Sequence, residues 1–223
     1  MDPNYKNVVV KKPWGYEYLA YENRFVGLWF LSLNENQKTS FHCHPLKTSG
    51  LFVIKGEAKV SFFEDNFIVK TGQKMMIRKG LFHSTKSVSK DGTLILEIET
   101  PKDKLDLVRL DDIYGRTAKP YEGTSEEYEK DNSCRWIEDP SKGTTNLYDF
   151  LGVKIKVENI SNADQFNKKN DKENLMFLRG GILCNNQNIT QPGDIVKIST
   201  IKKLIKTFKR IEYNTTVLSI STN

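Results

Sequence analysis

The sequence holds only three histidines, His42, His44 and His83, and their spacing suits a metal site. His42 and His44 lie one residue apart in SFHCH, so the alternation of a strand places both rings on one face. His83 follows about 40 residues later, just after the turn residues 78–80. Two ligands from one strand and a third from a distant strand can meet inside a barrel. The alternative is that the three rings only fill or decorate a barrel interior.

This pattern predicts one divalent transition metal per chain, Zn, Fe or Ni, because neutral imidazoles suit these ions better than Mg or Ca. Metal binding is expected to fall below about pH 6, where free imidazole takes up a proton. Cys43 alternates to the opposite face of the strand and is expected to be a core residue rather than a ligand.

The residues around the histidines predict short β-strands. Apolar, β-branched runs are separated by turn residues such as Asn34-Glu35-Asn36 and Lys55-Gly56, at the spacing typical of a sandwich or barrel. Helix is expected to be minor, since no long stretch has a period of 3.6 residues. The predicted strands are Val26–Leu33, Leu51–Ile54, Ala58–Phe63, Lys74–Ile77 and Thr93–Glu99.

A second series of strands follows a polar, acidic stretch over residues 121–145, which we interpret as a connection with one short helix around Ser125–Lys130. The series repeats the order of the first: FVIKGEAKV is echoed by MFLRGGILC, and TGQKMMI by QPGDIVKI. An internal repeat of this kind predicts a duplicated barrel, with a metal-binding copy at residues 1–120 and a degenerate copy at 146–223. The strands predicted in the second copy are Tyr148–Val157, Leu175–Phe177, Gly181–Leu183, Asp194–Ile198 and Thr216–Ile220.

The second copy is not expected to bind metal. Aligning Gly180 with Gly56 places Phe166, Lys168 and approximately Leu204 where the first copy has its three histidines. None of these side chains is a ligand of the required kind, which predicts one metal per chain, in the first barrel only.

Two stretches resemble the sequence signatures of the cupin superfamily. Residues 36–56, with Asn36, HxH, Ser49 and Gly56, resemble the first signature, G-x5-HxH-x3,4-E-x6-G. Residues 72–87 resemble the second, G-x5-PxG-x2-H-x3-N. The resemblance implies a double-stranded β-helix, or jelly roll. Asn36 replaces a glycine, which is tolerable because Asn accepts positive φ, and Ser49 stands where the family has a metal-binding Glu.

A more specific resemblance is to the C-terminal cupin module of type II mannose-6-phosphate isomerases. It rests on KPWG at residues 12–15, SFHCHPLKTSGLFVIKG at 40–56 and LDLVRLDDIYGR at 105–116. The departures fall at the chemistry, with His42 for the family's Gln, Lys47 for its Arg, Ser49 for its Glu and Leu51 for its Trp. The resemblance therefore implies a related fold and a sugar-like ligand more firmly than mannose 6-phosphate itself.

Isomerisation of an aldose to a ketose needs a group that polarises a carbonyl and a base that moves a proton. Glu97 is the expected base, with Glu99 beside it, unless one or both face solvent at a sheet edge. Lys47 and Arg116 are the expected phosphate-binding residues, and Arg78 is a further candidate, although Arg116 is equally suited to a salt bridge with a neighbouring aspartate. Trp14, Tyr16 and Trp29 can stack on a sugar, with core packing favoured for Trp29.

Composition limits the class of protein. The chain has 223 residues with a net charge of +6, and its basic and acidic residues are interleaved, so no nucleic-acid partner is expected. The run Ile201–Arg210 is interpreted as the solvated face of a strand pair. No apolar run is long enough to cross a membrane, and three scattered cysteines with no signal peptide indicate the cytoplasm.

Together these features predict a metal-binding bicupin that acts as a sugar-phosphate isomerase of carbohydrate metabolism, with a small carbohydrate as substrate and a homodimer as the assembly. One alternative is a three-His Fe(II) dioxygenase for a small molecule, since the missing Glu leaves the charge of the metal uncompensated. The other is a sugar-binding cupin that has lost catalysis.

Overall fold

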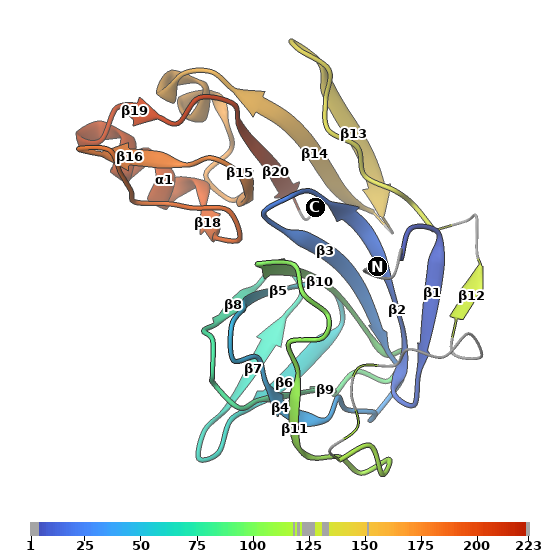
Figure 1. Cartoon of the computed structure of the whole chain (residues 1–223). Coiled ribbons are helices and arrows are strands. Elements are labelled where there is room, and N and C mark those ends of the chain that lie inside the picture. The colour runs from blue at the N-terminus through green and yellow to red at the C-terminus, as the bar shows by residue number, and fades with distance from the viewer. Residues whose placement is uncertain are drawn as a thin grey trace. The chain divides into compact units, whose positions relative to one another are not determined.

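The computed structural model describes residues 5–117, 119, 121, 128–130, 134–150 and 152–221. The chain divides into two compact units, residues 1–136 and 137–223. The boundary between them falls inside the segment that the sequence analysis interpreted as a connection. Both units are built mainly of β-strands, so the prediction of an all-β fold is confirmed (Figure 1).

The first unit is formed by short antiparallel strands. They are β1 (Val8–Lys12), β2 (Gly15–Glu22), β3 (Gly27–Leu33), β4 (Phe41–Cys43), β5 (Thr48–Lys55), β6 (Glu57–Ser61), β7 (Asn66–Lys70), β8 (Lys74–Ile77), β9 (Ser84–Ser87), β10 (Thr93–Thr100), β11 (Val108–Asp111) and β12 (Tyr128–Lys130).

The strand order of this unit is that of a jelly roll. One sheet has the order β12-β1-β2-β3-β10-β5-β8, and the other contains β7-β6-β9. The pair β11-β4 adjoins the second sheet through a bridge between His42 and His83. From β3 to β10 the chain thus passes repeatedly between two four-stranded layers, β3-β10-β5-β8 and β4-β9-β6-β7, which is the double-stranded β-helix that the sequence predicts.

The interior of the first unit changes from apolar to polar along its strands. Ile95 on β10 lies opposite Val53 on β5, and both belong to the apolar core. Further along the same inward face, Glu97 lies opposite Leu51 and Glu99 lies opposite Ser49. Side chains of one face repeat every second residue, so β10 carries the core at one end and two acids at the other.

Two turns depend on backbone conformations with positive φ. Gly56 has φ +82°, and a Cβ there would lie 2.6 Å from the carbonyl oxygen of Gly92, so no other residue fits without movement. Asn36 has φ 59°, as expected for the residue that replaces a glycine of the cupin signature.

The second unit has its own pair of sheets. Its elements are β13 (Thr145–Phe150), β14 (Val153–Ile160), the 3-10 helix η2 (Ala163–Lys168), β15 (Asn174–Arg179), β16 (Ile182–Cys184), β17 (Gln187–Asn188), β18 (Ile195–Lys197), the helix α1 (Ile198–Thr207), β19 (Arg210–Ile211) and β20 (Thr215–Ser221). The sheet orders are β13-β14-β20-β15-β18 and β17-β16-β19. In chain order these correspond to β2-β3-β10-β5-β8 and β7-β6-β9 of the first unit.

One prediction for the second unit is wrong: Ile201–Arg210 is not a strand pair. Helix α1 covers most of this run, because Ile198, Ile201 and Ile205 recur at helical spacing and are buried against the core. The lysines between them gave the stretch an imperfect alternation that imitated a strand. Leu204, aligned approximately with His83 from the sequence, lies within this helix.

Two smaller predictions are also corrected. The short helix expected at Ser125–Lys130 lies partly outside the described residues, and Tyr128–Lys130 form strand β12, which pairs with β1. The single strand expected at Tyr148–Val157 is two antiparallel strands, β13 and β14, with Gly152 at φ +83° in the turn between them.

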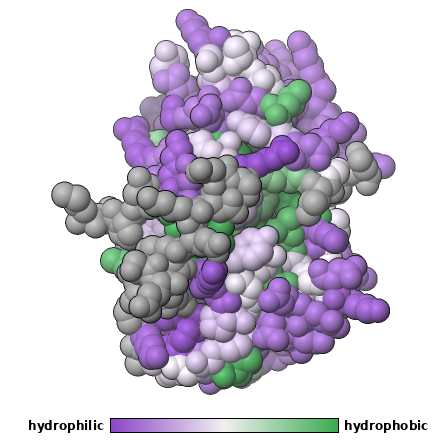
Figure 2. Space-filling view, turned by 90° about the vertical axis from the view of Figure 1, so that its right-hand side faces the viewer, coloured by the Kyte–Doolittle hydropathy of each residue, from purple (hydrophilic) through white to green (hydrophobic). Residues whose placement is uncertain are grey.

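The described part of the chain contains no helix long and apolar enough to span a membrane. The face of the molecule drawn in Figure 2 is mostly hydrophilic, with apolar side chains in separate areas.

Candidate metal centre

The structure brings all three histidines together. One ring nitrogen from each of His42, His44 and His83 lies within 4.8 Å of the others. The backbone explains this arrangement, because His42 on β4 pairs with His83 through two hydrogen bonds of 2.8 and 2.9 Å between their amides and carbonyls. His44 follows two residues after His42 and points to the same side of the strand.

Hydrogen bonds at Nδ1 leave the same nitrogen of each ring available to a metal. His42 Nδ1 donates to the carbonyl of Ser40 at 2.8 Å, and His83 Nδ1 donates to that of Leu81 at 2.9 Å. His44 Nδ1 donates to the carbonyl of Asp106 at 2.6 Å. A carbonyl oxygen only accepts, so each Nδ1 carries the proton and each Nε2 keeps a lone pair. The donor set therefore fits a transition metal bound by three neutral imidazoles.

Burial keeps these rings neutral. It lowers the pKa of His44 to about 3, with a further contribution from the charge of Lys47, and it lowers the pKa of His83 to about 4. The pKa of His42 is also well below its ordinary value, because of burial and of the other two rings. Neutral imidazole is the form that coordinates a metal, so the site is ready for a cation at neutral pH.

The histidines open into a cavity of about 70 Å³ inside the first unit. Glu97, Glu99 and Lys47 all line it, so the structure places the predicted base and a predicted phosphate ligand beside the histidines. Other lining residues include Lys12, Trp14, Glu17, Ser40, Lys104, Arg109, Arg116 and Tyr121.

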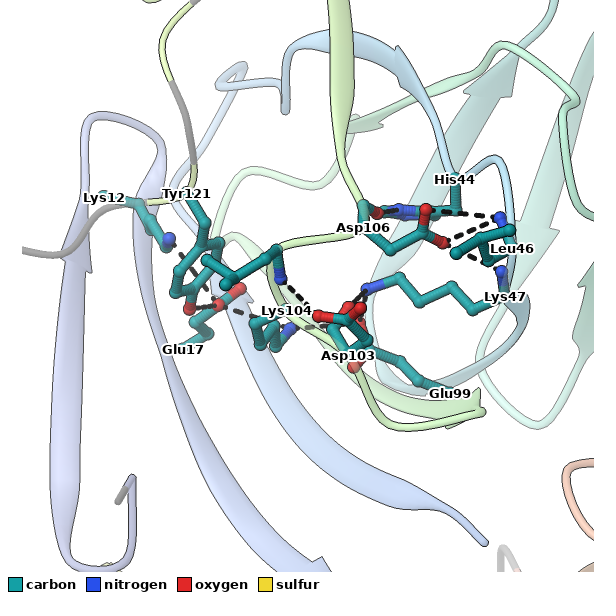
Figure 3. Close-up of polar contacts among 11 residues, drawn as sticks. Lys12, Glu17, His44, Leu46, Lys47, Glu99, Asp103, Lys104, Asp106 and Tyr121 are labelled. Atoms are coloured by element: carbon teal, nitrogen blue, oxygen red, sulfur yellow. Dashed lines mark hydrogen bonds and ion pairs between the residues drawn. The ribbon is translucent and has the colours of Figure 1, made fainter. Parts of the chain in front are cut away.

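Asp106 holds the segment that carries His44. Its carbonyl accepts the His44 Nδ1 proton, and its carboxylate accepts the backbone amides of Leu46 at 3.0 Å and Lys47 at 2.8 Å (Figure 3). Three contacts from one residue thus fix the turn between β4 and β5. Asp106 was not among the residues predicted for the site, although it lies within the LDLVRLDDIYGR motif.

A row of buried ion pairs extends from Lys47 along residues that line the cavity (Figure 3). Lys47 Nζ donates to Glu99 Oε1 at 2.8 Å and to the carbonyl of Asp103 at 3.0 Å. Lys104 Nζ lies 3.1 Å from the same Glu99 oxygen and 3.5 Å from Glu17 Oε1. Glu17 continues the row to Lys12 at 3.6 Å.

The two acids of β10 differ in their surroundings, and neither faces solvent. Burial alone raises the pKa of Glu99, but the charges of Lys104 and Lys47 outweigh it and hold the pKa below its usual range. Burial and the negative charge of Glu99 raise the pKa of Glu97 to about 7. Among the described residues, the Glu97 carboxyl forms no hydrogen bond or ion pair. Glu97 is thus a buried carboxyl that exchanges its proton near neutral pH.

Some of the remaining predicted residues line the cavity and others lie away from it. Arg116 lines the cavity, but its guanidinium binds the carboxylate of Asp112 with two contacts, of 2.8 and 3.0 Å, which is the salt bridge considered from the sequence. Arg78 is exposed and does not line the cavity. Trp14 and Trp29 both pack in the core, and Trp14 also lines the cavity.

Three further residues line the cavity but were not predicted from the sequence: Glu17, Lys104 and Tyr121. The Tyr121 hydroxyl donates to Glu17, and Lys104 Nζ lies 3.8 Å from the centre of the Trp29 ring. These residues follow the quoted motifs or lie between them. No spacing rule connects them, because their proximity arises from the folding of distant segments.

Comparison with known proteins gives structural similarity only. No protein-family model matches the sequence, and no curated protein matches it. Similar solved structures include KdgF from Halomonas sp., with 12% identity, a TM-score of 0.39 and coverage of 41% of this chain and 84% of that one. A protein with a double-stranded β-helix domain from Klebsiella pneumoniae has 14% identity, a TM-score of 0.40 and coverage of 50% and 86%. The cupin domain of Schizosaccharomyces pombe Cnp3 has 11% identity, a TM-score of 0.36 and coverage of 39% and 65%.

The strand order of the first unit decides the fold. It is a cupin fold. The candidate metal centre of this cupin unit rests on its own three histidines and their hydrogen bonds.

Proposed function

We propose that the first unit is a metal-dependent isomerase of small sugar phosphates. The observation that carries the proposal is Glu97, a buried carboxyl that lines the same cavity as the three histidines and has a pKa raised to about 7. A general base is most effective when its pKa lies near the working pH. Glu97 meets this condition because of its burial and of the neighbouring Glu99.

In this proposal each group has one task. The three Nε2 atoms would hold a divalent metal, which would supply Lewis-acid polarisation of the substrate carbonyl. Glu97 removes the proton from the carbon next to the carbonyl and returns a proton to the former carbonyl carbon. A hydroxyl proton moves between the two oxygens at the same time, so the reaction needs no oxidant or reductant. Lys47 and Lys104 keep Glu99 ionised, and Glu99 in turn keeps the pKa of Glu97 high.

An anionic substrate is favoured by the other residues of the cavity. Lys12, Lys104, Arg109 and Arg116 line it in addition to Lys47. Several of these cations are paired with acids, but together with a divalent metal they give the cavity a positive field that attracts a phosphate. The substrate class proposed is therefore a sugar that carries a phosphate. Lys47 and Arg116 are the residues proposed to bind that phosphate.

We also propose that the second unit is a degenerate second cupin copy. The matching strand orders of the two units support this interpretation. A further support is that Gly56 and Gly180, aligned from the sequence, both have positive φ at corresponding turns. A homodimer is proposed as the assembly, to be tested by light scattering.

The test is turnover by the purified, metal-loaded protein across a panel of hexose phosphates, compared with Glu97→Gln. We expect isomerisation of at least one substrate and a loss of about 10²- to 10⁴-fold in kcat for the variant, the usual contribution of a general base. Bound metal should be unchanged in Glu97→Gln. Absence of turnover across the whole panel would remove the isomerase proposal and leave the fold intact.

A second candidate function is a three-His Fe(II) dioxygenase. The observation that favours it is that the clustered ligands are three neutral imidazoles without a carboxylate, which leaves the charge of an iron ion for an anionic substrate to balance. Oxygen uptake with iron and none with zinc would select this function over the isomerase. Tight binding of a saccharide with neither reaction would indicate a non-catalytic sugar-binding cupin.

A further inference from the structure

One buried carboxylate oxygen beside the cavity lacks a hydrogen-bond donor within the residues that the structure describes. Glu99 is only 2% exposed, and its Oε2 has no hydrogen-bond partner among the described residues, whereas Oε1 accepts from Lys47 and Lys104. Buried polar atoms are almost always paired, and an ionised oxygen without a partner is costly. This oxygen needs a donor that the described part of the chain does not supply.

Glu97 lies beside Glu99, and its carboxyl group also has no hydrogen-bond partner among the described residues. The two side chains are two residues apart on the inward face of β10, so their Cβ atoms lie roughly 7 Å from each other. Glu97 is 7% exposed and unpaired within the described residues. Two buried carboxyl groups in one cavity can therefore form further hydrogen bonds at neighbouring positions.

The surroundings restrict what kind of donor can approach. Lys47 and Lys104 already lie against Glu99, and a third ammonium group from a ligand would be repelled by them. Neutral hydroxyl groups meet no such repulsion and form strong hydrogen bonds to carboxylates. At about 10–15 Å³ of such space for each water-sized group, the cavity of about 70 Å³ admits several hydroxyl groups of a ligand.

We infer that Glu97 and Glu99 form a subsite for neighbouring hydroxyl groups of a polyhydroxylated ligand. This inference deepens the proposed function and rests on it only for the placement of the ligand in this cavity. It assigns Glu99 a contact with the ligand in addition to its ion pairs with the two lysines.

The test measures binding of probes that contain no carbonyl and cannot be isomerised. The zinc-loaded full chain is titrated calorimetrically with D-glucitol 6-phosphate and with its analogues lacking the hydroxyl at carbon 2 or at carbon 3. We expect one of the two analogues to bind at least about tenfold more weakly than the parent, as for loss of a hydrogen bond to a charged group. Glu99→Gln should bind the parent about tenfold more weakly and should lose most of the difference between parent and analogue.

Two further variants keep the result interpretable. Glu97→Gln changes an acid that forms no ion pair with the described residues, so it tests the subsite while keeping the ion pairs of Glu99 with Lys47 and Lys104, and it should also weaken binding of the parent. Ser49→Ala is the matched control, because Ser49 lies directly opposite Glu99 but does not line the cavity, and it should leave binding unchanged. An effect of Ser49→Ala as large as that of Glu99→Gln would show that Ser49 is the missing donor and would overturn the inference.

Equal binding of parent and analogues by the wild-type protein, or no binding of any of them, would also overturn it. Binding with the expected pattern but without turnover of hexose phosphates would instead reject the isomerase proposal and leave the hydroxyl subsite standing.

Discussion

The two units share a strand order and differ in what fills their interiors. In the first, strand β4 between β3 and β5 carries His42 and His44, and the segment between β8 and β9 carries His83. In the second, the corresponding places are taken by η2, between β14 and β15, and by α1, between β18 and β19. The two segments that build the metal centre are thus the two that the second unit replaces with helices.

The buried side chains of these two helical segments are apolar. Phe166 of η2 and Ile198, Ile201 and Ile205 of α1 are buried in one hydrophobic cluster. In the first unit the corresponding region holds three imidazoles and a row of buried lysines and glutamates. Units with the same strand order thus hold either a polar site or an apolar filling, and the side chains of two connecting segments decide which one is present.

The largest expected effect is loss of the metal when a histidine is removed. Changing His42, His44 or His83 to Ala should each remove most of the bound metal, because two remaining imidazoles do not replace the missing bond. Inductively coupled plasma mass spectrometry of untreated protein should give one metal per wild-type chain. Folding should survive, since the unit has an apolar core of its own.

A His83→Ala protein with full metal occupancy would reject the three-His centre. Two metals per wild-type chain would reject the contrast between the units, because the second unit contains no histidine.

The second prediction tests the apolar filling. Phe166→Ala should lower the free energy of unfolding by about 3–5 kcal/mol, the usual cost of truncating a fully buried aromatic residue, as measured by urea denaturation. Metal content should stay at the wild-type level. A parallel loss of metal would show that the two units depend on each other, contrary to the comparison.

The sequence predicted the first unit better than the second. HxH, the glycine turns and the later His83 identified both the jelly roll and its clustered rings, because strand alternation and turn residues are local signals. Helix α1 was missed because its lysines disguised the spacing of Ile198, Ile201 and Ile205. Its burial decides the structure, and burial depends on contacts with η2 that no local pattern contains.

The sequence also did not reveal the residues that act through contacts between distant segments. Asp106 and Lys104 reach the site from the segment after β10, and their roles follow from hydrogen bonds to Lys47, His44 and Glu99 rather than from spacing.

The third prediction concerns Asp106, which supports the metal centre of the first unit. Asp106→Ala removes the acceptor of two amides in the turn that carries His44, and should weaken metal affinity about 10- to 100-fold, as for other outer-shell partners of metal ligands. Competition with a chromophoric chelator measures this affinity. Asp103→Asn is the control, since it keeps the Oδ1 acceptor of the Leu105 amide and the backbone carbonyl that Lys47 contacts. Equal affinities of both variants and the wild type would show that the turn holds His44 without Asp106.

The smallest expected change is that caused by mild acid. A proton and a metal compete for the same Nε2 lone pair, so a lower imidazole pKa moves the loss of metal to lower pH. Free imidazole predicts loss of metal below about pH 6, but burial lowers the pKa of His83 to about 4 and that of His44 to about 3. Metal content after dialysis should therefore be the same at pH 5 as at pH 7, and should fall only near pH 4. Half-loss at pH 6 would mean that the rings are hydrated as in a surface site, and that the interior of the first unit is more open than its buried histidines indicate.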